Sequence, residues 1–454
     1  MLRVWGGGIF ERQHFYNECD RLGILVTQDF LMACGSYPEE KPDFISQLLL
    51  ETEEAAYALR NHPCLVWWSG DNENAVRGAD DMETYKGRAA IHEGIIPVLD
   101  RLDPQRRFML SSPCGGKFYA SKTVGTTHNT QYLGESVFPF ILDTDMSDYK
   151  EHFSQYLARF IAEEPTAGAI STPSLRQFMT EDDILGSTEM WEYHTKGNPA
   201  LSTTLFEIFS SFARKVLGDY KDCADRLFKL KYAQFEWVRI TFENFRRNRG
   251  FSNGMIYWMW DDCWPAAAGW SFVDWYGLPK ASYYSFKRCA GELLTSIEKK
   301  TDFEISVCND SLTDLQVTLS LSYLLEGELY RITDTVVTAK AASSFVALRL
   351  PEDVLPKGAV LICDALSGER QDRSFYKAGK LLIRPTDALR VTARKEDSVT
   401  LIADGYVHAA ELEGSFVFSD NYFSLLPGES RTITFRNAEV GFDADITVSG
   451  YTVE

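Results

Sequence analysis

The sequence lacks three features that would each define a class of protein. No apolar run reaches the roughly 20 residues of a membrane-spanning helix, so no membrane partner is expected. Lys and Arg total 46 against 65 Asp and Glu, a formal charge of -19, and without a basic excess no nucleic-acid partner is expected. The nine cysteines are scattered and form no C-x-x-C pair, which favours buried free thiols over disulfides or a zinc site.

Several catalytic motifs are also absent. The chain has no G-x-S-x-G turn around a nucleophilic serine and no H-x-x-x-H pair for a metal ion. The loop Gly6–Gly8 lacks the Lys of a phosphate-binding loop and the spacing of its third glycine, which favours a loop required by close packing. A metal-dependent hydrolase using acidic residues and His128 stays open as an alternative, and it would lose activity with a chelator.

What the chain does have is an alternation of short apolar strands with helices over its first 295 residues. Such an alternation predicts a parallel sheet covered on both faces. An eight-stranded barrel needs one strand more than the seven found, so we expect a (β/α)8 TIM barrel that lacks its first βα unit. The strands are expected at 2–5, 24–27, 65–68, 108–111, 124–128, 160–163 and 255–260. Longer helices are expected at 42–61, 80–102, 188–215, 222–247 and 280–294.

The pattern changes near residue 296. From Asp302 onward apolar and polar residues alternate, with turn residues about every 8–12 positions, which is typical of antiparallel β-sandwiches. Pro385 separates two such stretches. The expected fold class is α/β plus all-β, since a chain of 454 residues exceeds one domain. The expected domains are an incomplete barrel at 1–295 and immunoglobulin-like β-sandwiches at 296–384 and 385–454.

The stretch 61–73 is the most informative part of the barrel region. It contains a helix end, a His-Pro turn and a short apolar strand that releases Asp71, Asn72 and Glu73 at its C-terminal end. In a barrel, packed strands fix the backbone and the residues at their C-terminal ends face the substrate. A solvated acidic turn after a core strand is the alternative interpretation.

Polar and aromatic residues also follow the other predicted strands. Two carboxylates on opposite sides of a barrel mouth suit a glycosidase, in which one protonates the leaving oxygen and the other attacks the anomeric carbon. Adjacent Glu163 and Glu164 point to opposite sides of a strand, so only one of them faces the site. The candidates are Trp5, Asp29, Asn72, Glu73, His128, Glu163 and Trp258, with Asp261 and Asp262 following the last.

Several long motifs resemble glycoside hydrolase family 2, and most closely its β-mannosidase branch. They occur in the order expected for that family and are spread over nearly the whole chain. The family's N-terminal sugar-binding-like and immunoglobulin-like domains are expected to be absent. The motifs are Arg3–Glu11, Phe15–Phe30, Asn61–Glu73, Tyr257–Pro265 and Ser419–Glu429.

The resemblance implies a role for each candidate. Glu73 matches the family's acid/base, Glu163 matches its nucleophile, and Asn72 matches an Asn that binds the sugar 2-hydroxyl. The other candidates, expected to bind substrate, are Trp5, Asp29, His128 and Trp258. Ordinary packing remains the alternative for the two tryptophans and a structural role the alternative for the histidine.

Two departures concern the sugar subsite. The family's Ser-Glu-Phe-Gly around the nucleophile is Ala162-Glu163-Glu164-Pro165 here, and its His-x-Trp is His128-Asn129-Thr130. Both changes affect the expected mannose specificity more than glycoside cleavage itself.

The resemblance therefore implies a retaining exo-acting β-glycosidase that releases terminal non-reducing β-D-mannose from an oligosaccharide or a glycoprotein glycan. Two carboxylates suffice for this chemistry, so no cofactor is expected. The alternatives are exo-β-glucosaminidase, β-galactosidase or β-glucuronidase activity, or an inactive truncated fragment that binds carbohydrate.

Overall fold

The computed structural model of the chain divides into two compact units. The first unit comprises residues 1–136, 157–164 and 251–257, and the second comprises residues 137–156, 165–250 and 258–454. The structure describes residues 1–75, 85, 87–128, 141–147, 149–186, 188–195 and 204–454.

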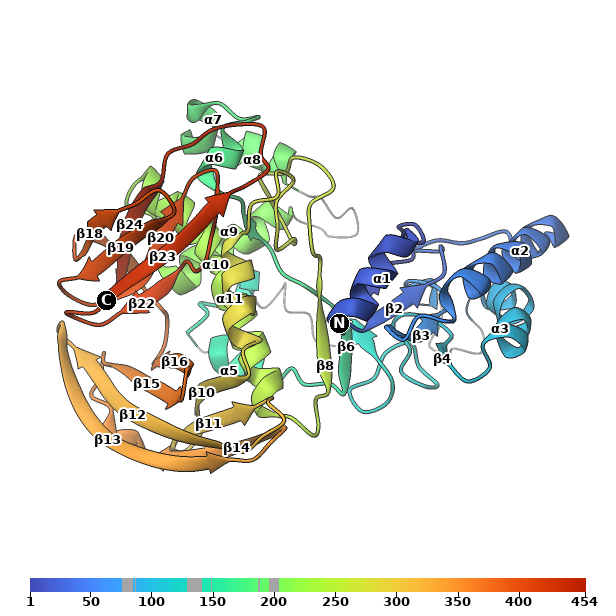
Figure 1. Cartoon of the computed structure of the whole chain (residues 1–454). Helices are drawn as coiled ribbons and strands as arrows, with labels where there is room; N and C mark the ends of the chain where they lie inside the picture. Colours follow the sequence, from blue (N-terminus) through green and yellow to red (C-terminus); the bar gives the residue numbers. More distant parts are fainter. Residues whose placement is uncertain (76–84, 86, 129–140, 148, 187, 196–203) are drawn as a thin grey trace. The chain divides into compact units, whose positions relative to one another are not determined.

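Four strands of the first unit form a parallel sheet in the order β1-β2-β3-β4 (Figure 1). Leu2 pairs with Val26, and Val26 pairs in turn with Leu65. Since all four strands run in the same direction, their C-terminal ends meet at one edge of the sheet. The strands are β1 (Leu2–Val4), β2 (Val26–Asp29), β3 (Leu65–Ser69) and β4 (Arg107–Met109).

Helices join these strands. Gly23 ends the first helix with a φ of 68°, a left-handed cap that glycine adopts without strain. An added Cβ at Gly94 would lie 2.6 Å from the side chain of Leu48, so the second helix packs tightly on the π-helical turn. The helices are α1 (Gln13–Leu22), α2 (Pro42–Leu59), the π-helix η2 (Ala90–Ile95) and α3 (Ile96–Leu102). Part of the helix expected over 80–102 lies outside the described residues.

Three further strands form a second sheet in the order β5-β6-β8. Thr127 pairs with Ile161, and β5 and β6 are parallel. All seven strands expected from the sequence are therefore present, with their ends shifted by at most three residues. Within the described residues they occupy two separate sheets, so the (β/α)8 barrel is not confirmed and stays a prediction. The strands are β5 (Thr127–His128), β6 (Phe160–Pro165) and β8 (Gly254–Trp258).

The second unit combines helices with β-sandwiches. Its core extends along α10, whose Phe228 stacks on Tyr451 of the C-terminal strand, with ring centroids 3.4 Å apart. The helices are α5 (Tyr149–Ser154), α6 (Thr172–Leu175), α7 (Glu181–Gly186), α8 (Thr188–His194), α9 (Leu205–Leu217), α10 (Cys223–Arg247) and α11 (Ala281–Cys289). A short antiparallel pair consists of β7 (Gly168–Ala169) and β9 (Ala268–Gly269).

The first sandwich packs a three-stranded sheet, β10-β11-β14, against a four-stranded sheet, β13-β12-β15-β16. In β12, buried and more exposed residues alternate from Leu315 to Leu321, as the period of two in the sequence predicts. They are β10 (Leu293–Lys299), β11 (Phe303–Asn309), β12 (Leu315–Leu325), β13 (Glu328–Ala339), β14 (Ser343–Leu350), β15 (Val360–Ser367) and β16 (Arg370–Lys377), with the 3-10 turn η4 (Glu352–Val354).

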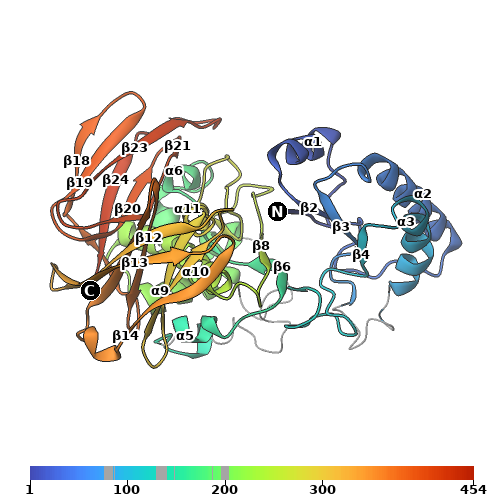
Figure 2. The same cartoon turned by 60° about the horizontal axis from the view of Figure 1, so that its bottom comes forward.

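The second sandwich has two four-stranded sheets, β17-β24-β20-β22 and β18-β19-β23-β21, shown in red in Figure 2. Within the described residues, no helix is long and apolar enough to cross a membrane. The strands are β17 (Ile383–Thr386), β18 (Leu389–Arg394), β19 (Ser398–Ala403), β20 (Val407–Glu413), β21 (Phe416–Phe418), β22 (Phe423–Leu425), β23 (Ser430–Asn437) and β24 (Thr447–Val453).

One expected helix is shorter than the sequence indicates. The helix expected over 280–294 ends at Cys289, and strand β10 already begins at Leu293. Leu293 and Leu294 pair with Asn309 and Cys308, so these two leucines belong to the antiparallel sheet of the sandwich and not to the helix.

Candidate active site

The end of β3 carries the polar residues that the sequence analysis singled out. An added Cβ at Gly70 would lie 2.5 Å from a neighbouring carbonyl oxygen, so only glycine fits where the chain leaves the strand. Asn72 then continues the parallel pairing, forming bridges with Ala33 on one side and Ser112 on the other. The sheet therefore fixes the backbone directly before Glu73.

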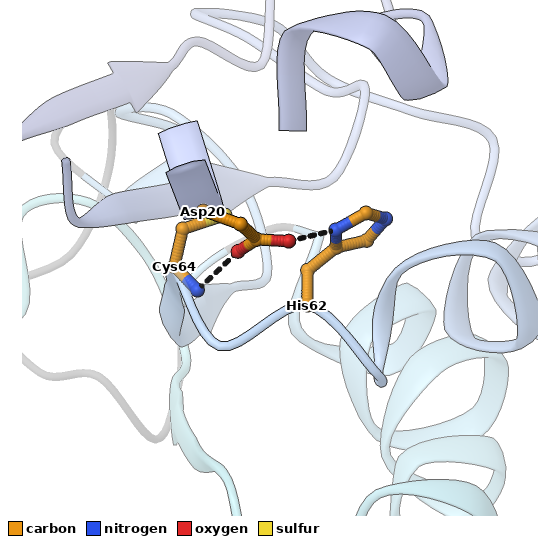
Figure 3. Close-up of side chains that lie close together, drawn as sticks. All are labelled: Asp20, His62 and Cys64. Carbon is orange, nitrogen blue, oxygen red and sulfur yellow. Dashed lines mark hydrogen bonds and ion pairs between the residues drawn. The ribbon is translucent and has the colours of Figure 1, made fainter. Parts of the chain in front are cut away.

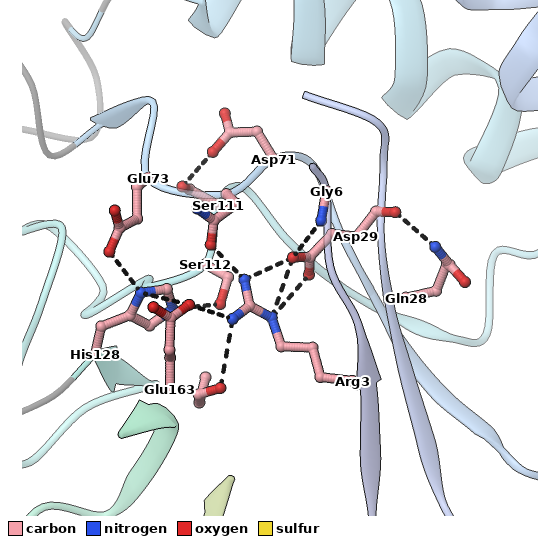
Figure 4. Close-up of polar contacts among 12 residues, drawn as sticks. Arg3, Gly6, Gln28, Asp29, Asp71, Glu73, Ser111, Ser112, His128 and Glu163 are labelled. Atoms are coloured by element: carbon pink, nitrogen blue, oxygen red, sulfur yellow. Dashed lines mark hydrogen bonds and ion pairs between the residues drawn. The ribbon is translucent and has the colours of Figure 1, made fainter. Parts of the chain in front are cut away.

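Glu73 itself has an unusual backbone conformation. Its φ is 59°, a left-handed value that costs a non-glycine residue about 1–2 kcal/mol. The Glu73 N–H donates to the carbonyl oxygen of Ser112 at 2.9 Å, and the Asn72 N–H donates to that of Met32 at 2.8 Å. These two bonds hold the turn, and the Glu73 side chain points toward His128 (Figure 4).

Arg3, on β1, is the central cation of the site. Its Nη1 donates to Oε2 of Glu163 at 2.9 Å, and its Nη2 donates to Asp29 and Asn72, at 2.6 Å in each case. Asp29 also accepts a bond from the backbone N–H of Gly6 at 3.2 Å. One buried guanidinium thus joins Asp29 of β2, Asn72 after β3 and Glu163 of β6. Figure 4 shows Arg3 between Asp29 and Glu163.

His128, at the end of β5, bridges the two glutamates. Its Nδ1 lies 2.9 Å from Oε1 of Glu73 and 3.5 Å from Oε2 of Glu163. Its Nε2 lies 2.8 Å from the hydroxyl oxygen of Ser112. A nitrogen that faces two carboxylates must donate, so this arrangement assigns the proton to Nδ1. The ring is fully buried, which keeps it in this orientation.

The two glutamates lie close together as a result. One oxygen of Glu73, one oxygen of Glu163 and a ring nitrogen of His128 all lie within 4.8 Å of one another. Retaining glycosidases place their two carboxyl groups about 5–5.5 Å apart, whereas inverting enzymes leave about 6.5–9.5 Å for a water molecule. The upper limit of 4.8 Å is shorter than the separation of an inverting pair.

The charges around Glu163 oppose one another. Burial raises the pKa of Glu163 above its usual value, His128 and Arg3 act to lower it, and the neighbouring Glu73 adds to the rise. The pKa of Arg3 is raised because the carboxylates of Asp29 and Glu163 outweigh the effect of burial. Arg3 is therefore a permanent positive charge beside Glu163.

Cys34 connects Asn72 with Glu73. Its thiol donates to Oε2 of Glu73 at 3.5 Å and accepts from the amide nitrogen of Asn72 at 3.4 Å. Burial, followed by the charge of Glu73, raises the pKa of Cys34 to about 11, so the group is a neutral thiol at physiological pH. The amide oxygen of Asn72 is turned toward Arg3.

The other predicted substrate ligands have different surroundings. Asp29 is fully buried, and its carboxylate accepts hydrogen bonds from Arg3 and from the Gly6 N–H. In this structure it therefore holds other residues of the site in place. Trp5 follows β1 and is half-buried, with its ring against the backbone of Gly7. Trp258, Asp261 and Asp262 belong to the second unit. Sugar binding by these residues stays a prediction.

Three residues of the network were not among the sequence candidates: Arg3, Cys34 and Ser112. The signal for Arg3 was present, because residues two apart on a strand share a face and Arg3 lies two before Trp5. Ser112 follows the predicted 108–111 strand, the same position that identified Asn72 and Glu73 after their own strand. Cys34 lies several residues beyond β2, and no local pattern marks it.

A second polar cluster lies in the same unit (Figure 3). Asp20, at the end of α1, accepts from Nδ1 of His62 at 2.6 Å and from the backbone N–H of Cys64 at 2.8 Å. Nε2 of His62 lies 2.9 Å from the amide oxygen of Gln13. These bonds join α1 to the loop before β3, which explains the cluster as a support for the strand that carries Glu73.

The two polar clusters also contain the residue types that bind metal ions. Within the described residues, Asp20, His62 and Cys64 form one group of possible ligand atoms, and Glu73, His128 and Glu163 form the other. In both groups the carboxylates and the histidine already bond to one another. The expectation of a metal-free reaction stays a prediction.

A larger hollow, of about 920 Å³, lies within the second unit. Several of its charged side chains pair with one another: Arg373 with Glu429 at 2.8 Å, and Asp420 with both Arg288 and Arg431. None of the predicted site residues lines it. Because these charged side chains are already paired, the hollow does not resemble the cluster of carboxylates and histidine around Glu73.

Comparison with known proteins adds a family context. Residues 385–451 match a family described as an Ig-fold domain, Ig_mannosidase. The chain is 29% identical over 427 residues to the β-mannosidase of Capra hircus, covering 84% of this chain and 45% of that protein. It is 24% identical over 410 residues to β-mannosidase B of Emericella nidulans, covering 84% of this chain and 46% of that protein. The chain thus spans about half the length of the curated relatives it matches.

Solved structures show the same fold. A β-D-mannosidase from Dictyoglomus thermophilum has a TM-score of 0.82 at 24% identity, over 99% of this chain and 56% of that one. An exo-chitosanase from Amycolatopsis orientalis has a TM-score of 0.71 at 17% identity, over 100% of this chain and 60% of that one. Both similarities extend over the whole described chain, including its two immunoglobulin-like sandwiches.

Proposed function

We propose, starting from the chain's place among the β-mannosidase-like proteins of glycoside hydrolase family 2, that it belongs to a retaining exo-β-glycosidase. We further propose terminal non-reducing β-D-mannose as the sugar released, because the relatives named above are β-mannosidases. The observation that carries the proposal is the approach of Glu73 and Glu163 to within 4.8 Å beside one buried histidine.

The seven short strands fit a (β/α)8 barrel whose catalytic groups lie at the C-terminal strand ends. Asn72 and Glu73 follow β3, and His128 ends β5. Glu163 lies on β6 and bonds to Arg3 on β1. Catalytic residues of such barrels come from several strand ends at one face, and the origin of these residues on several strands supports the proposal.

In the first half of the reaction, an oxygen of Glu163 attacks the anomeric carbon while Glu73 gives its proton to the glycosidic oxygen. The bond to the leaving group breaks as a covalent glycosyl ester forms. Arg3 and His128 both contact Oε2 of Glu163, so we assign the attack to Oε1. In the second half, Glu73 accepts a proton from water, the water oxygen attacks the anomeric carbon, and Glu163 leaves as a carboxylate with the β-configuration restored.

The surrounding residues have supporting roles. His128 and Arg3 favour the ionised form of Glu163 against the effect of burial, and a nucleophile must be ionised. Neutralisation of Glu163 in the ester removes a negative charge from beside Glu73, so Glu73 then releases its proton and can act as a base. Asn72 would turn its amide toward the sugar 2-hydroxyl, a bond that strengthens as the ring gains positive charge.

The decisive experiment is Glu163→Ala with azide. Hydrolysis of 4-nitrophenyl β-D-mannoside should fall by about 10⁴-fold or more, because the covalent step is lost. Added azide should restore 4-nitrophenol release and yield α-mannosyl azide, since the small anion takes the place of the carboxylate. The matched control is Glu164→Gln on the same strand, which should stay active. Unchanged hydrolysis in the Glu163→Ala variant would exclude the assignment.

A panel of nitrophenyl glycosides distinguishes the alternatives. Preferred cleavage of the β-glucosaminide, β-galactoside or β-glucuronide would replace mannose with that sugar. Cooperative unfolding of the purified chain without hydrolysis of any glycoside would favour a carbohydrate-binding role instead.

A further inference from the structure

Asp71 has no role in the reaction described above, although it lies two residues before Glu73. Its side chain is fully buried, and Figure 4 shows it behind the turn, on the side away from Glu163. A buried carboxyl group at such a position needs partners, because an unpaired charge away from water is strongly destabilising.

The partners of Asp71 are few. Oδ1 accepts a short hydrogen bond from the hydroxyl of Ser111 and a long one, 3.4 Å, from the backbone N–H of Asn74. Oδ2 has no hydrogen-bond partner in the described part of the chain. A carboxylate can accept about four hydrogen bonds, so this environment suits the ionised form poorly.

The charges that face Asp71 do not compensate for this. Asp29 on β2 repels a negative charge there, and Arg3 on β1, which attracts it, is already bonded to Asp29 and Glu163. The hydroxyl of Tyr85 is also nearby, and its pKa is raised by burial and then by Asp71. Burial raises the pKa of Asp71 to about 7.

Asp71 is tied to Glu73 through the chain that follows β4. The carbonyl oxygen of Asp71 accepts the N–H of Ser112 at 2.8 Å, and the carbonyl oxygen of Ser112 accepts the N–H of Glu73 at 2.9 Å. The Ser112 hydroxyl in turn contacts His128. The side-chain bond from Ser111 to Asp71 fastens the same two segments together, so it braces the left-handed turn of Glu73.

We propose that Asp71 is a positioning residue that acts as a neutral carboxylic acid: with Ser111 it holds the turn that aims Glu73 at the leaving oxygen. This inference rests on the proposed function, because the effect is expressed through acid catalysis by Glu73.

The first test compares Asp71→Ala and Asp71→Asn by leaving group. Asp71→Ala should slow hydrolysis of mannobiose, which needs protonation, by about 100-fold, since general acid catalysis supplies 10²–10⁴-fold. It should slow 2,4-dinitrophenyl β-mannoside, whose leaving group needs no proton, by only about threefold. The neutral isostere Asp71→Asn should keep both rates close to wild type. Equal slowing of both substrates, or loss in Asp71→Asn as deep as in Asp71→Ala, would overturn the proposal.

The second test needs no activity and so separates this inference from the proposed function. The melting temperature of wild type minus that of Asp71→Asn should fall between pH 4 and pH 7 and level off above that. In this range the carboxyl group is ionised in the unfolded chain but stays protonated in the folded protein. Ser111→Ala, which removes the hydroxyl donor but keeps the carboxyl group, should raise the pKa of Asp71 and extend this fall to higher pH, and it serves if Asp71→Asn does not fold. A difference that is independent of pH would show that Asp71 is ionised throughout, contrary to the proposal.

Discussion

Arg3 is the charged side chain at the centre of the candidate site. It is a buried cation that contacts Asp29, Asn72 and Glu163 at once. Asp29 fixes the orientation of the Arg3 guanidinium. The positive charge of that group favours the ionised carboxylate of Glu163. The positive charge that favours ionisation of Glu163 therefore comes from His128 on β5 and from Arg3 on β1.

Replacing Arg3 should change both the rate and its pH dependence. In Arg3→Leu, kcat for 4-nitrophenyl β-mannoside should fall by about 100-fold, as for loss of a catalytic electrostatic contact. The pKa of Glu163, already raised by burial, should rise further, so the acidic limb of kcat/KM should move up by about one pH unit or more. The control is Arg21→Leu, which breaks an exposed ion pair with Glu18 and should leave the profile unchanged. An unmoved acidic limb in Arg3→Leu would contradict this account.

At this scale the sequence identified the residues that follow strands and missed those that support them. Asn72, Glu73, His128 and Glu163 do meet in one network. A strand-end rule finds them because the end of a parallel strand is a local feature. The part of Asp29 as an anchor for Arg3 depends on where a long side chain folds back, which only the neighbouring strands decide.

Close backbone contacts explain how the elements hold the turn. An added Cβ at Gly6 would lie 2.5 Å from the carbonyl oxygen of Met32, and one at Gly70 would meet another carbonyl oxygen at the same distance. Both glycines follow strands of the first sheet. The missing side chains let consecutive strand ends approach, which brings Asp29 within reach of the Gly6 N–H.

Gly70→Ala should consequently disturb the site through the backbone alone. The Cβ cannot move away from a carbonyl oxygen, so the end of β3 must shift, and we expect a destabilisation of about 1–3 kcal/mol with a fall in kcat. Urea unfolding and the rate on 4-nitrophenyl β-mannoside measure the two effects. Gly186→Ala, where an added Cβ meets nothing within 4 Å, should change neither. Wild-type stability and a wild-type rate in Gly70→Ala would show that the end of β3 adjusts to the added Cβ, contrary to this prediction.

Short strands between helices were predicted well because they are continuous apolar runs closed by Gly or polar residues. All seven occur, yet their assembly into one ring was not established by the pattern. Strand pairing across a barrel depends on tilt and stagger, which no single run encodes. The end of α11 was misplaced for a related reason, since Leu293 and Leu294 suit either a helix face or a strand.

On the scale of the whole molecule, the second unit contains a buried histidine that should respond to acid. His408 is buried between Tyr232 and Tyr406, whose hydroxyls lie 3.2 Å and 3.0 Å from its two ring nitrogens. One hydroxyl can donate and the other accept, which suits a neutral ring. Burial lowers the pKa of His408 to about 3.

Stability should therefore decrease at low pH through His408. The ring is neutral in the folded state and gains a proton on unfolding below about pH 6.5, so its contribution is intact above that value and lost as the pH falls toward 3. At pH 4 the difference amounts to about 3 kcal/mol. Urea unfolding of His408→Gln at pH 4 and pH 7 should show a flatter dependence than wild type, whereas the exposed control His14→Gln should match wild type. Parallel curves for wild type and His408→Gln would refute this.

The β-sandwiches followed from the sequence more completely than the rest. Period-two alternation gives the buried face of each strand directly, and strands such as β12 show it residue by residue. The boundary between the two compact units falls within β6, at Pro165, and within β8, at Trp258. The amino-acid composition does not change at these positions, so the sequence did not predict this division. The proposed boundaries at 295 and 384 rest on pattern and remain predictions.

The left-handed backbone of Glu73 implies that selection for activity and selection for stability disagree at this position. A protein chosen only for its resistance to unfolding would place glycine there, because glycine adopts a φ of 59° without strain. Glu73→Gly should be more stable than Glu73→Ala by about 1 kcal/mol in urea unfolding, although both lack the carboxyl group proposed as the acid/base. A population evolving without its substrate would then be expected to lose this glutamate early, since doing so makes the fold more robust.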